Sequence, residues 1–328
     1  MNRHTSSWLG RVVTAATVAA LVGACASGGS TPSQTKALVI GYVTKSATNQ
    51  GWILINAGAT DAAKAAGAQL VTVGPAQAES LTGQLSAIED MVNRHVNALA
   101  IAPVDSAGVA PAVQKALDAH IPVVAIDTAV TGANVTSFVA TDNLKAAGIQ
   151  GNWVAQHISD DGSLILVNGQ ISQSTGRDRH DGFVQALKAT KPKVTIYEVQ
   201  TNWDQTQAQS GVEALLIAHP NVSFIVNAWD GGTMGAIAAL KARNSTAGKV
   251  SVVGFDGAPN ALQAMEQNWV QADVAQMLYQ QGYKGIQTAI AAAQGKTVDA
   301  RVDTGTGLVT PDNVKQFIID NHLQQFMQ

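Results

Sequence analysis

Cysteine is almost absent from this chain, since Cys25 is the only one among 328 residues. No disulfide bond can form within the chain, so the fold depends on its hydrophobic core. Aromatic residues make up only 5% of the sequence and charged residues only 13%, whereas 46% of the residues are hydrophobic. Ala and Val are abundant, which is typical of Val-rich parallel strands packed under Ala-rich helices.

The chain also lacks the features of a nucleic-acid-binding or catalytic protein. Its formal net charge is −3, and it has no basic run, so we expect no nucleic-acid partner. The seven histidines are scattered, and none pairs with another His or with Cys at the spacing of metal ligands. No P-loop, G-x-G-x-x-G or G-x-S-x-G motif occurs. We therefore expect neither an enzyme nor a cofactor or metal site.

Long apolar runs are missing too, and the longest lies near the N-terminus. Arg3 and Arg11 precede an apolar stretch over residues 12–22. This stretch is too short for a bilayer core of about 30 Å and has the length of a secretory signal. Residues 26–36 are rich in Ser, Gly, Thr and Pro, a composition typical of flexible linkers. We predict a signal peptide over residues 1–24 and a tether over residues 25–36.

The end of this leader, LVGAC at residues 21–25, resembles a bacterial lipobox. The resemblance implies that Cys25 is lipidated and becomes the new N-terminus, so that the protein is an extracytoplasmic lipoprotein. Two acyl chains are sufficient for stable anchoring to a membrane. The alternative is an ordinary signal peptide whose cleavage site happens to include a cysteine.

From residue 37 onwards, short apolar runs alternate with helix-length segments. Most runs are continuous in Val, Ile, Leu and Ala, which indicates strands buried on both faces. We predict strands at 37–44, 69–73, 98–102, 123–127, 136–141, 163–168, 194–199, 223–227, 250–255 and 270–276. We predict helices at 53–66, 81–95, 107–119, 144–158, 176–190, 205–219, 232–242, 258–267 and 277–294.

This alternation predicts an α/β fold with parallel sheets connected by right-handed crossovers. Ten strands are too many for one ordinary sheet, so we predict two lobes. Ser80 is a candidate N-cap for the helix that begins at Leu81. Gly67 is a candidate C-cap for the first helix.

Polar and aromatic side chains follow the ends of several predicted strands. Ligands of open α/β sheets bind at the carboxyl ends of the strands, so these residues are candidates for a binding site. They include Asn49, Trp52, Asp127, Thr128, Arg179, Trp203, Trp229 and Asp256.

Nine short motifs in a defined order carry a family resemblance. They are NQGW (49–52), APVDS (102–106), PVVAID (122–127), ATDN (140–143), RHDGF (179–183), NWD (202–204), AHPN (218–221), VGFDG (253–257) and AQ (275–276). The chain resembles the type I periplasmic solute-binding proteins over residues 37 to about 310. It is most similar to the ribose-binding-protein-like branch that serves sugar ABC transporters.

The resemblance implies two Rossmann-like, three-layer lobes with parallel sheets, joined by a three-strand hinge. It places residues 37–141 and about 277–304 in the N-terminal lobe, and residues 142–276 and about 305–328 in the C-terminal lobe. The two lobes would close on a sugar like a hinged clamp.

The same resemblance implies which residues bind the ligand. Asn49, Trp52 and Asp127 would contribute from the first lobe, Arg179, Trp203 and Asp256 from the second, and Gln276 from the hinge. Carboxylates accept hydrogen bonds from sugar hydroxyls, an Arg donates to hydroxyl oxygens, and indoles cover the C–H faces. Thr128 stands where the family often has Arg, and Trp229 where it often has Asn. Both differences favour a smaller or linear ligand, such as a sugar alcohol, at least as well as a pyranose.

Several of these residues have alternative interpretations. Asp127 and Asp256 are also candidates for helix N-caps, a common place for Asp. Arg177 competes with Arg179 as the ligand-binding arginine. Trp52 and Trp229 are alternatively core residues.

We predict an extracytoplasmic, lipid-anchored protein that binds a monosaccharide or sugar alcohol. As a monomer, it would deliver that ligand to an ABC permease and its ATPase. One alternative is a sensory protein that presents a sugar to a membrane receptor, and another is an exported carbohydrate-active enzyme. A cytoplasmic sugar-responsive repressor has the same fold, but the leader and the lack of an N-terminal helix-turn-helix argue against it.

Overall fold

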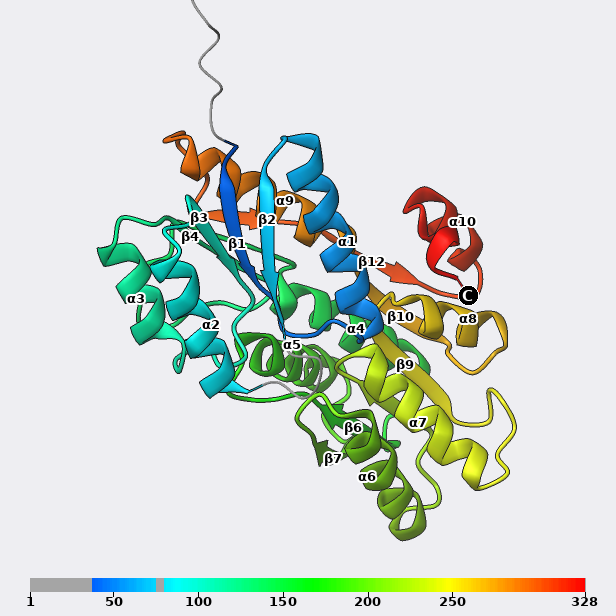
Figure 1. Cartoon of the computed structure of the whole chain (residues 1–328). Coiled ribbons are helices and arrows are strands. Elements are labelled where there is room, and N and C mark those ends of the chain that lie inside the picture. The colour runs from blue at the N-terminus through cyan, green and yellow to red at the C-terminus, as the bar shows by residue number, and fades with distance from the viewer. Residues whose placement is uncertain (1–36, 75–79, 328) are drawn as a thin grey trace, which may run out of the picture. The chain divides into compact units, whose positions relative to one another are not determined.

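The computed structural model describes residues 37–74 and 80–327, in which strands and helices alternate (Figure 1). The predicted signal peptide, Cys25 and the tether lie outside these residues. The strands are β1 (Val39–Val43), β2 (Gln69–Val73), β3 (Ala98–Ile101), β4 (Val123–Ile126), β5 (Ser137–Ala140), β6 (Ser163–Asn168), β7 (Thr195–Gln200), β8 (Phe224–Asn227), β9 (Ser251–Asp256), β10 (Ala272–Gln276), β11 (Arg301–Asp303) and β12 (Thr306–Val309). The helices are α1 (Gln50–Ala65), α2 (Leu81–Asn93), α3 (Ala110–Asp118), α4 (Asn143–His157), α5 (Ser174–Thr190), α6 (Gln205–Ala218), α7 (Asp230–Ala242), α8 (Pro259–Glu266), α9 (Leu278–Ala293), α10 (Val314–Asp320) and the 3-10 helix η1 (Leu323–Phe326).

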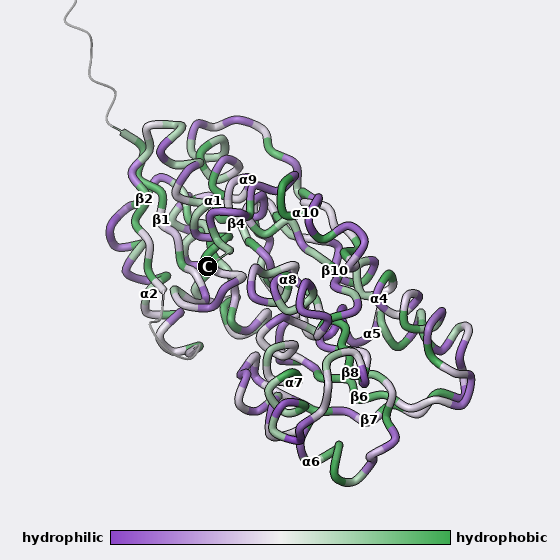
Figure 2. Tube along the Cα trace, turned by 90° about the vertical axis from the view of Figure 1, so that its right-hand side faces the viewer, coloured by the Kyte–Doolittle hydropathy of each residue, from purple (hydrophilic) through white to green (hydrophobic). Residues whose placement is uncertain are grey.

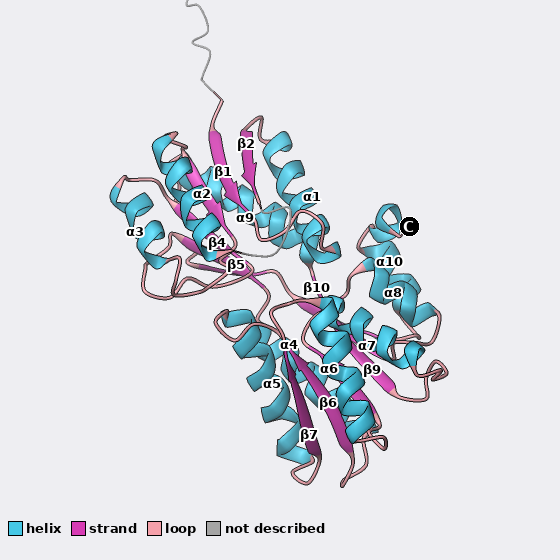
Figure 3. Cartoon of the chain, turned by 60° about the horizontal axis from the view of Figure 1, so that its bottom comes forward, coloured by secondary structure: helices cyan, strands magenta, loops and turns pink. Residues whose placement is uncertain are grey.

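The strands form two six-stranded sheets, each covered by helices (Figure 3). The first sheet has the order β11-β5-β4-β3-β1-β2, and its neighbouring strands are all parallel. The second has the order β12-β10-β9-β8-β6-β7, and only its edge strand β12 is antiparallel to its neighbour. The predicted α/β fold with two lobes is confirmed.

The inner strands are buried on both faces, as their continuous apolar runs predict. Every residue of β3, β4 and β8 is buried. Figure 2 shows hydrophobic chain around β6 and β8, whereas helices such as α5 and α6 alternate between hydrophilic and hydrophobic residues. Helices pack in pairs against the sheets: α1 lies against α9, and α4 lies against α5.

Several helix ends have a local cause in the sequence. The Ser80 hydroxyl accepts a hydrogen bond from Gly83 N at 3.3 Å, which confirms this residue as the N-cap of α2. Asp142 caps α4 and Asp204 caps α6 in the same way. Gly67 follows the end of α1 with φ of +63°, a left-handed conformation that glycine adopts without strain.

The chain passes between the two sheets three times within residues 80–327: after β5, after β10 and after β11. Hydrogen bonds connect these crossings to one another. Gln281 Nε2 donates to Thr141 Oγ1 at 3.1 Å and to Gln276 Oε1 at 2.8 Å, and the hydroxyls of Thr141 and Thr304 lie 3.4 Å apart. The crossings therefore form one bonded hinge, and Gln276 belongs to it.

Most predicted elements are present with ends shifted by a few residues, but four short ones are missing from the sequence prediction. These are the strands β11 and β12, the helix α10 and the 3-10 helix η1, of three to seven residues each. β11 and β12 lack the continuous buried apolar runs of the predicted strands, and the two helices are shorter than the window of about 11 residues that a helical period requires. β12 also contains Gly307, and glycine is uncommon in strands.

Candidate functional site

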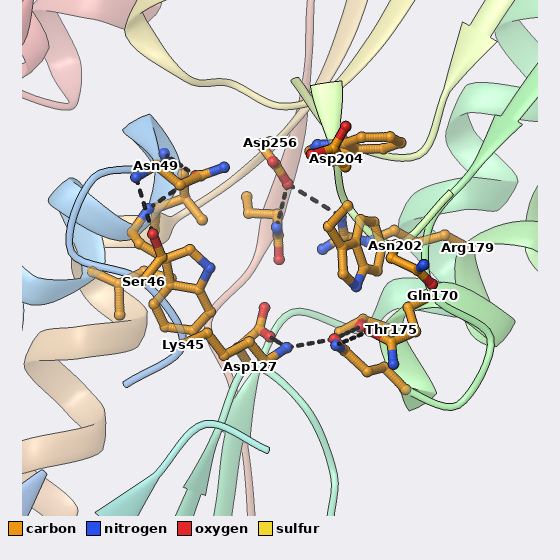
Figure 4. Close-up of a pocket in the computed structure, with 18 of the residues that line it drawn as sticks. Lys45, Ser46, Asn49, Asp127, Gln170, Thr175, Arg179, Asn202, Asp204 and Asp256 are labelled. Atoms are coloured by element: carbon orange, nitrogen blue, oxygen red, sulfur yellow. Dashed lines mark hydrogen bonds and ion pairs between the residues drawn. The ribbon is translucent and has the colours of Figure 1, made fainter. Parts of the chain in front are cut away.

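A cavity of about 610 Å³ lies between the carboxyl ends of the two sets of strands. It is lined by eight of the nine residues that the sequence singles out as ligand-binding: Asn49, Trp52, Asp127, Arg179, Trp203, Trp229, Asp256 and Gln276. Further polar residues complete the wall: Lys45, Ser46, Thr48, Gln170, Gln173, Thr175, Asn202, Asp204 and Gln207. In Figure 4, Asp127 and Asp256 approach the same space from opposite sides.

The first lobe contributes a buried ion pair to this cavity. Asp127 follows β4, and its Oδ2 accepts from Lys45 Nζ at 2.9 Å and from the Thr128 hydroxyl at 2.7 Å. Burial alone would raise the pKa of Asp127, but the charges of Lys45 and Arg179 outweigh it and hold the pKa below its usual value. Asp127 is therefore ionised, and its Oδ1 has no hydrogen-bond partner among the described residues.

The second lobe contributes Arg179 from α5 and Asp256 from the end of β9. Arg179 Nη1 lies 3.2 Å from Asp256 Oδ1, which also accepts from Gln276 Nε2 at 2.6 Å. Arg179 donates in addition to Asn143 Oδ1 at 2.8 Å and to the Ala228 carbonyl at 2.7 Å, so its guanidinium is fixed. Its Nη2 is the nitrogen without an acceptor among the described residues, and it remains available to a ligand.

Asp256 has the opposite pKa shift from Asp127. Burial raises the pKa of Asp256, and the neighbouring Arg179 and the hydrogen bond from Gln276 only partly offset this effect. Because Gln276 also bonds with Gln281, the carboxylate is connected directly to the hinge.

Three tryptophans form aromatic walls of the cavity. Trp203 and Trp229 meet edge to face, with ring centroids 5.3 Å apart and planes at 88°. The Arg179 guanidinium lies over the Trp203 ring at 5.7 Å, and Lys45 Nζ lies 5.6 Å from the Trp52 ring centroid. Such rings suit the apolar C–H faces of a carbohydrate. Outside the cavity, Trp153 stacks on His157, a packing contact.

Glycines make room for two of these indoles. A Cβ on Gly169 would lie 2.0 Å from Trp203 Cη2. A Cβ on Gly232, in the first turn of α7, would lie 2.8 Å from Trp229 Cζ3. Any larger residue at either position would displace an indole from the cavity wall.

Three residues of the cavity wall have a strained backbone. Asp127, Trp203 and Asp256 have φ of +66°, +58° and +127°, respectively. Such conformations cost about 1–3 kcal/mol each for residues other than glycine and cluster at binding sites. All three line the cavity.

Asn49 has a structural role and also faces the cavity. Its Oδ1 caps α1 by accepting from Gly51 N at 2.9 Å and from Trp52 N at 3.4 Å. Its side-chain amide nitrogen has no hydrogen-bond partner within the described part of the chain. The two capping bonds therefore fix the orientation of this amide nitrogen in the cavity wall.

Thr128 is the sequence candidate that does not line the cavity. It is fully buried behind Asp127, and its hydroxyl accepts from Lys45 Nζ at 2.7 Å. It acts on the cavity through the Lys45–Asp127 pair and through Thr175, whose hydroxyl lies 3.4 Å from that of Thr128.

The alternative interpretations of the charged residues are also decided by geometry. Neither Asp127 nor Asp256 is the N-cap residue of a helix that follows it: no helix follows Asp127 directly, and Ala258 is the N-cap residue of α8. Asp256 instead accepts from Asp230 N at the start of α7. Arg177 is exposed and donates to the Ile171 carbonyl at 2.9 Å, away from the cavity lining. Arg179 is 5% exposed and lines it.

Lys45 is the most important residue that the sequence reasoning did not select. It lies two residues after the end of β1. The expectation that ligands bind at the carboxyl ends of strands therefore includes it, but it belongs to none of the nine motifs. Its ammonium donates to Asp127, to Thr128 and to Gln173 Oε1 of the second lobe at 2.6 Å. The segment after β6 holds Gln170 and Gln173, and it also lies at the carboxyl end of a strand. The sequence reasoning did not select these two residues either.

Hydrogen bonds between the lobes close one edge of the cavity. Ser106 N donates to the Ser172 carbonyl at 3.2 Å, and Ser174 N donates to the Ser106 hydroxyl at 2.9 Å. Together with the Lys45–Gln173 bond, these contacts align the start of α5 with the loops after β1 and β3.

Comparisons with known proteins decide the family. A family model described as "Periplasmic binding protein domain" matches residues 40–297. This chain belongs to the type I periplasmic binding proteins, in their ribose-binding-protein-like branch. The ribose import binding protein RbsB of Haemophilus influenzae is 31% identical over 290 residues, which are 88% of this chain and 96% of the relative.

Solved structures of periplasmic binding proteins agree with this assignment. An ABC transporter solute-binding protein from Mycobacterium smegmatis with bound glycerol has 30% identity and a TM-score of 0.79, covering 86% of this chain and 96% of its own. A second from Agrobacterium vitis with bound D-fucose has 28% identity and a TM-score of 0.82, covering 86% of this chain and 99% of its own. Members of this family are binding proteins rather than enzymes, and the family implies an extracytoplasmic location.

No helix within residues 37–74 and 80–327 combines the length and apolarity needed to cross a membrane. In the same ranges, no three His, Cys, Asp or Glu side chains are grouped so that they could hold a metal ion.

Proposed function

We propose that this protein captures an uncharged sugar or sugar alcohol between its two lobes and delivers it to an ABC importer. One observation carries the proposal: each lobe aims a carboxylate paired with a cation into the same cavity. Asp127 with Lys45 comes from the first lobe, and Asp256 with Arg179 comes from the second. A ligand that contacts both lobes favours the closed form over the open one.

The charges of the site favour an uncharged ligand. The two carboxylates are balanced by two cations, and the fifth charged residue of the lining, Asp204, is exposed and caps α6. Sugar hydroxyls both donate and accept hydrogen bonds, so Asp127 Oδ1 could accept from one hydroxyl and Arg179 Nη2 could donate to another.

The relatives support a carbohydrate as ligand, and they differ in its size. Their names and bound molecules include ribose, D-fucose and glycerol. In this chain Trp229 adds an indole to the cavity wall where the family often has Asn. We therefore propose a pentose, a small sugar or a linear polyol of four or five carbons as the ligand class.

A thermal-shift screen tests this proposal. The panel contains D-ribose, D-allose, D-fucose, xylitol, erythritol and glycerol, with sugar acids as charged controls. A ligand at about 100 times its Kd raises the free energy of unfolding by about 2.7 kcal/mol. Stabilisation by any uncharged member of the panel supports an uncharged ligand, whereas stabilisation by the six-carbon sugars D-allose and D-fucose alone contradicts the proposed size. A response to the sugar acids alone contradicts the proposal.

The N-terminal sequence supports a lipid anchor at Cys25, which would hold the protein beside its permease at the membrane. Cys25→Ser should release the protein from the membrane fraction and leave ligand binding unchanged. A variant that fractionates with membranes as the natural protein does would show that the leader is an uncleaved anchor rather than a lipobox.

A further inference from the structure

Two carboxyl groups lie buried beneath the binding site, outside the cavity lining. Asp230 begins α7 and is 2% exposed, and Asp273 lies on β10 and is 0% exposed. Neither forms an ion pair with a described residue. Buried carboxylates without a cation are rare, because burial strongly disfavours their charged form.

The two carboxyls meet over Gly254 of β9. A Cβ on Gly254 would lie 2.3 Å from Asp273 Oδ2 and 2.7 Å from Asp230 Oδ1, so these two oxygens fill the space of a side chain. Asp273 Oδ2 has no donor among the described residues if both carboxyls are ionised. A single proton between the carboxyls would provide the missing hydrogen bond, since a protonated carboxyl is a donor.

The remaining oxygens of this acid pair hold the loop that carries Asp256. Gly257 N donates to Asp273 Oδ1 at 2.9 Å, and Ala258 N donates to Asp230 Oδ2 at 2.7 Å. Asp230 N in turn lies 3.4 Å from Asp256 Oδ2. The loop needs this support, because Asp256 has a φ of +127°, a strained conformation for a residue other than glycine.

The charges that face the pair are those of Asp256 from β9 and Arg179 from α5. Arg179 is already paired with Asp256. Burial, together with the charges of the neighbouring acids, raises the pKa of Asp230 well above its usual value. Burial is also the main cause that raises the pKa of Asp273 to about 7.

We propose that Asp273 is a positioning residue: it shares one proton with Asp230, and the protonated pair fixes the Asp256–Ala258 loop so that Asp256 faces the ligand. Loss of the proton leaves two like charges a few ångströms apart in a buried site. Their repulsion exceeds the gain from stronger N–H bonds to each carboxylate, so the loop loosens. The role of the loop in ligand binding rests on the proposed function, but the shared proton does not.

Infrared spectroscopy of the full protein, without any ligand, tests the shared proton. Between about pH 5 and pH 6, above the ordinary pKa of Asp, the natural protein should show the carbonyl band of a buried protonated carboxyl. Asp273→Asn keeps the shape and donates permanently to Asp230, so this band should be lost. The matched control Asp312→Asn, at an exposed position, should retain it. Absence of the band from the natural protein would overturn the proposal even if the variant failed to fold.

Amide hydrogen exchange at Gly257 and Ala258 tests the positioning role. In the natural protein and in Asp312→Asn, protection of these amides should fall by about tenfold or more as the pair loses its proton. A tenfold change corresponds to a shift of one unit in the pKa of the pair between the closed and the open loop. In Asp273→Asn the protection should stay constant over the same pH range. The same pH dependence in all three proteins would contradict the proposal. Neither readout depends on the identity of the ligand, so a failure of the proposed function remains distinguishable.

Discussion

The two lobes present similar carboxylates to one cavity and treat them in opposite ways. Asp127 and Asp256 both follow parallel strands, both have positive φ and both pair with a cation. Yet the pKa of Asp127 is lowered and that of Asp256 is raised. The difference lies in how far the effect of burial is offset. At Asp127 the charges of Lys45 and Arg179 outweigh burial, whereas at Asp256 the charge of Arg179 and the hydrogen bond from Gln276 offset it only in part. Neighbours, rather than position at a strand end, set the charge of each carboxylate.

The largest effect is expected from Arg179→Ala in the second lobe. This change removes the one cation that the described residues place beside Asp256, Asp230 and Asp273. It also removes the hydrogen bond from Arg179 Nε to Asn143 Oδ1. Removal of one partner from a buried pair typically costs about 3–5 kcal/mol, and the upper end applies here. Urea unfolding should show this loss, together with loss of ligand binding in calorimetry.

Arg177→Ala is the matched control, because Arg177 is exposed on the same helix. It should change the free energy of unfolding by no more than about 0.5 kcal/mol. Equal losses from the two variants would show that Arg179 is not the specific partner of Asp256.

A smaller loss is expected from Lys45→Met in the first lobe. Asp127 keeps its hydrogen bond from Thr128, so the cost should lie near the lower end of the same range, about 3 kcal/mol. The pKa of Asp127 should rise, which would make it resemble Asp256. NMR titration of the aspartate carboxyl would detect this change, and an unaltered pKa would refute the role given to Lys45.

The two lobes should also differ in how pH affects them. Because the folded pKa of Asp127 lies below its unfolded value of about 3.9, this residue stabilises the fold above about pH 4, and that stability is lost as the pH falls through the folded pKa. Asp273 has a raised pKa, so its contribution is present at low pH and is lost as the pH rises towards about 7.

Unfolding experiments across pH separate these two contributions. In Asp127→Asn, the free energy of unfolding should depend less on pH below about pH 4 and be unchanged in its pH dependence above it. Asp273→Asn should flatten the pH dependence between about pH 4 and pH 7 alone. If both variants changed the pH dependence of the free energy of unfolding over the same pH range, the two carboxyls would not differ in the way described.

The smallest effect is expected from the aromatic wall. Trp203→Ala removes the ring beneath Arg179 and should weaken ligand binding by about tenfold, or about 1.4 kcal/mol. Trp153→Ala is the control, because Trp153 stacks on His157 outside the cavity, and it should leave the affinity nearly unchanged. Binding titrations followed by tryptophan fluorescence test this pair, and equal losses would place Trp203 outside the site.

Much of this architecture could be predicted from the sequence, because its signals are local. Buried parallel strands appear as continuous apolar runs, and their polar ends mark the cavity edge, as with Asp127 and Asp256. The role of Lys45 could not be predicted, since its three acceptors come from both lobes and lie up to 128 residues away. The pairing of Asp230 with Asp273 depends equally on which strands become neighbours, and Gly254 between them shows no special pattern in the sequence.

The central claim is that one ligand is held by a carboxylate from each lobe. Isothermal titration calorimetry of Asp127→Ala and Asp256→Ala, with the compound that stabilises the natural protein most, tests it directly. A hydrogen bond to a charged group contributes about 1.5–3 kcal/mol, so each variant should bind about tenfold to a hundredfold more weakly. Unchanged affinity in both variants would contradict the account and leave these two carboxylates with structural roles only.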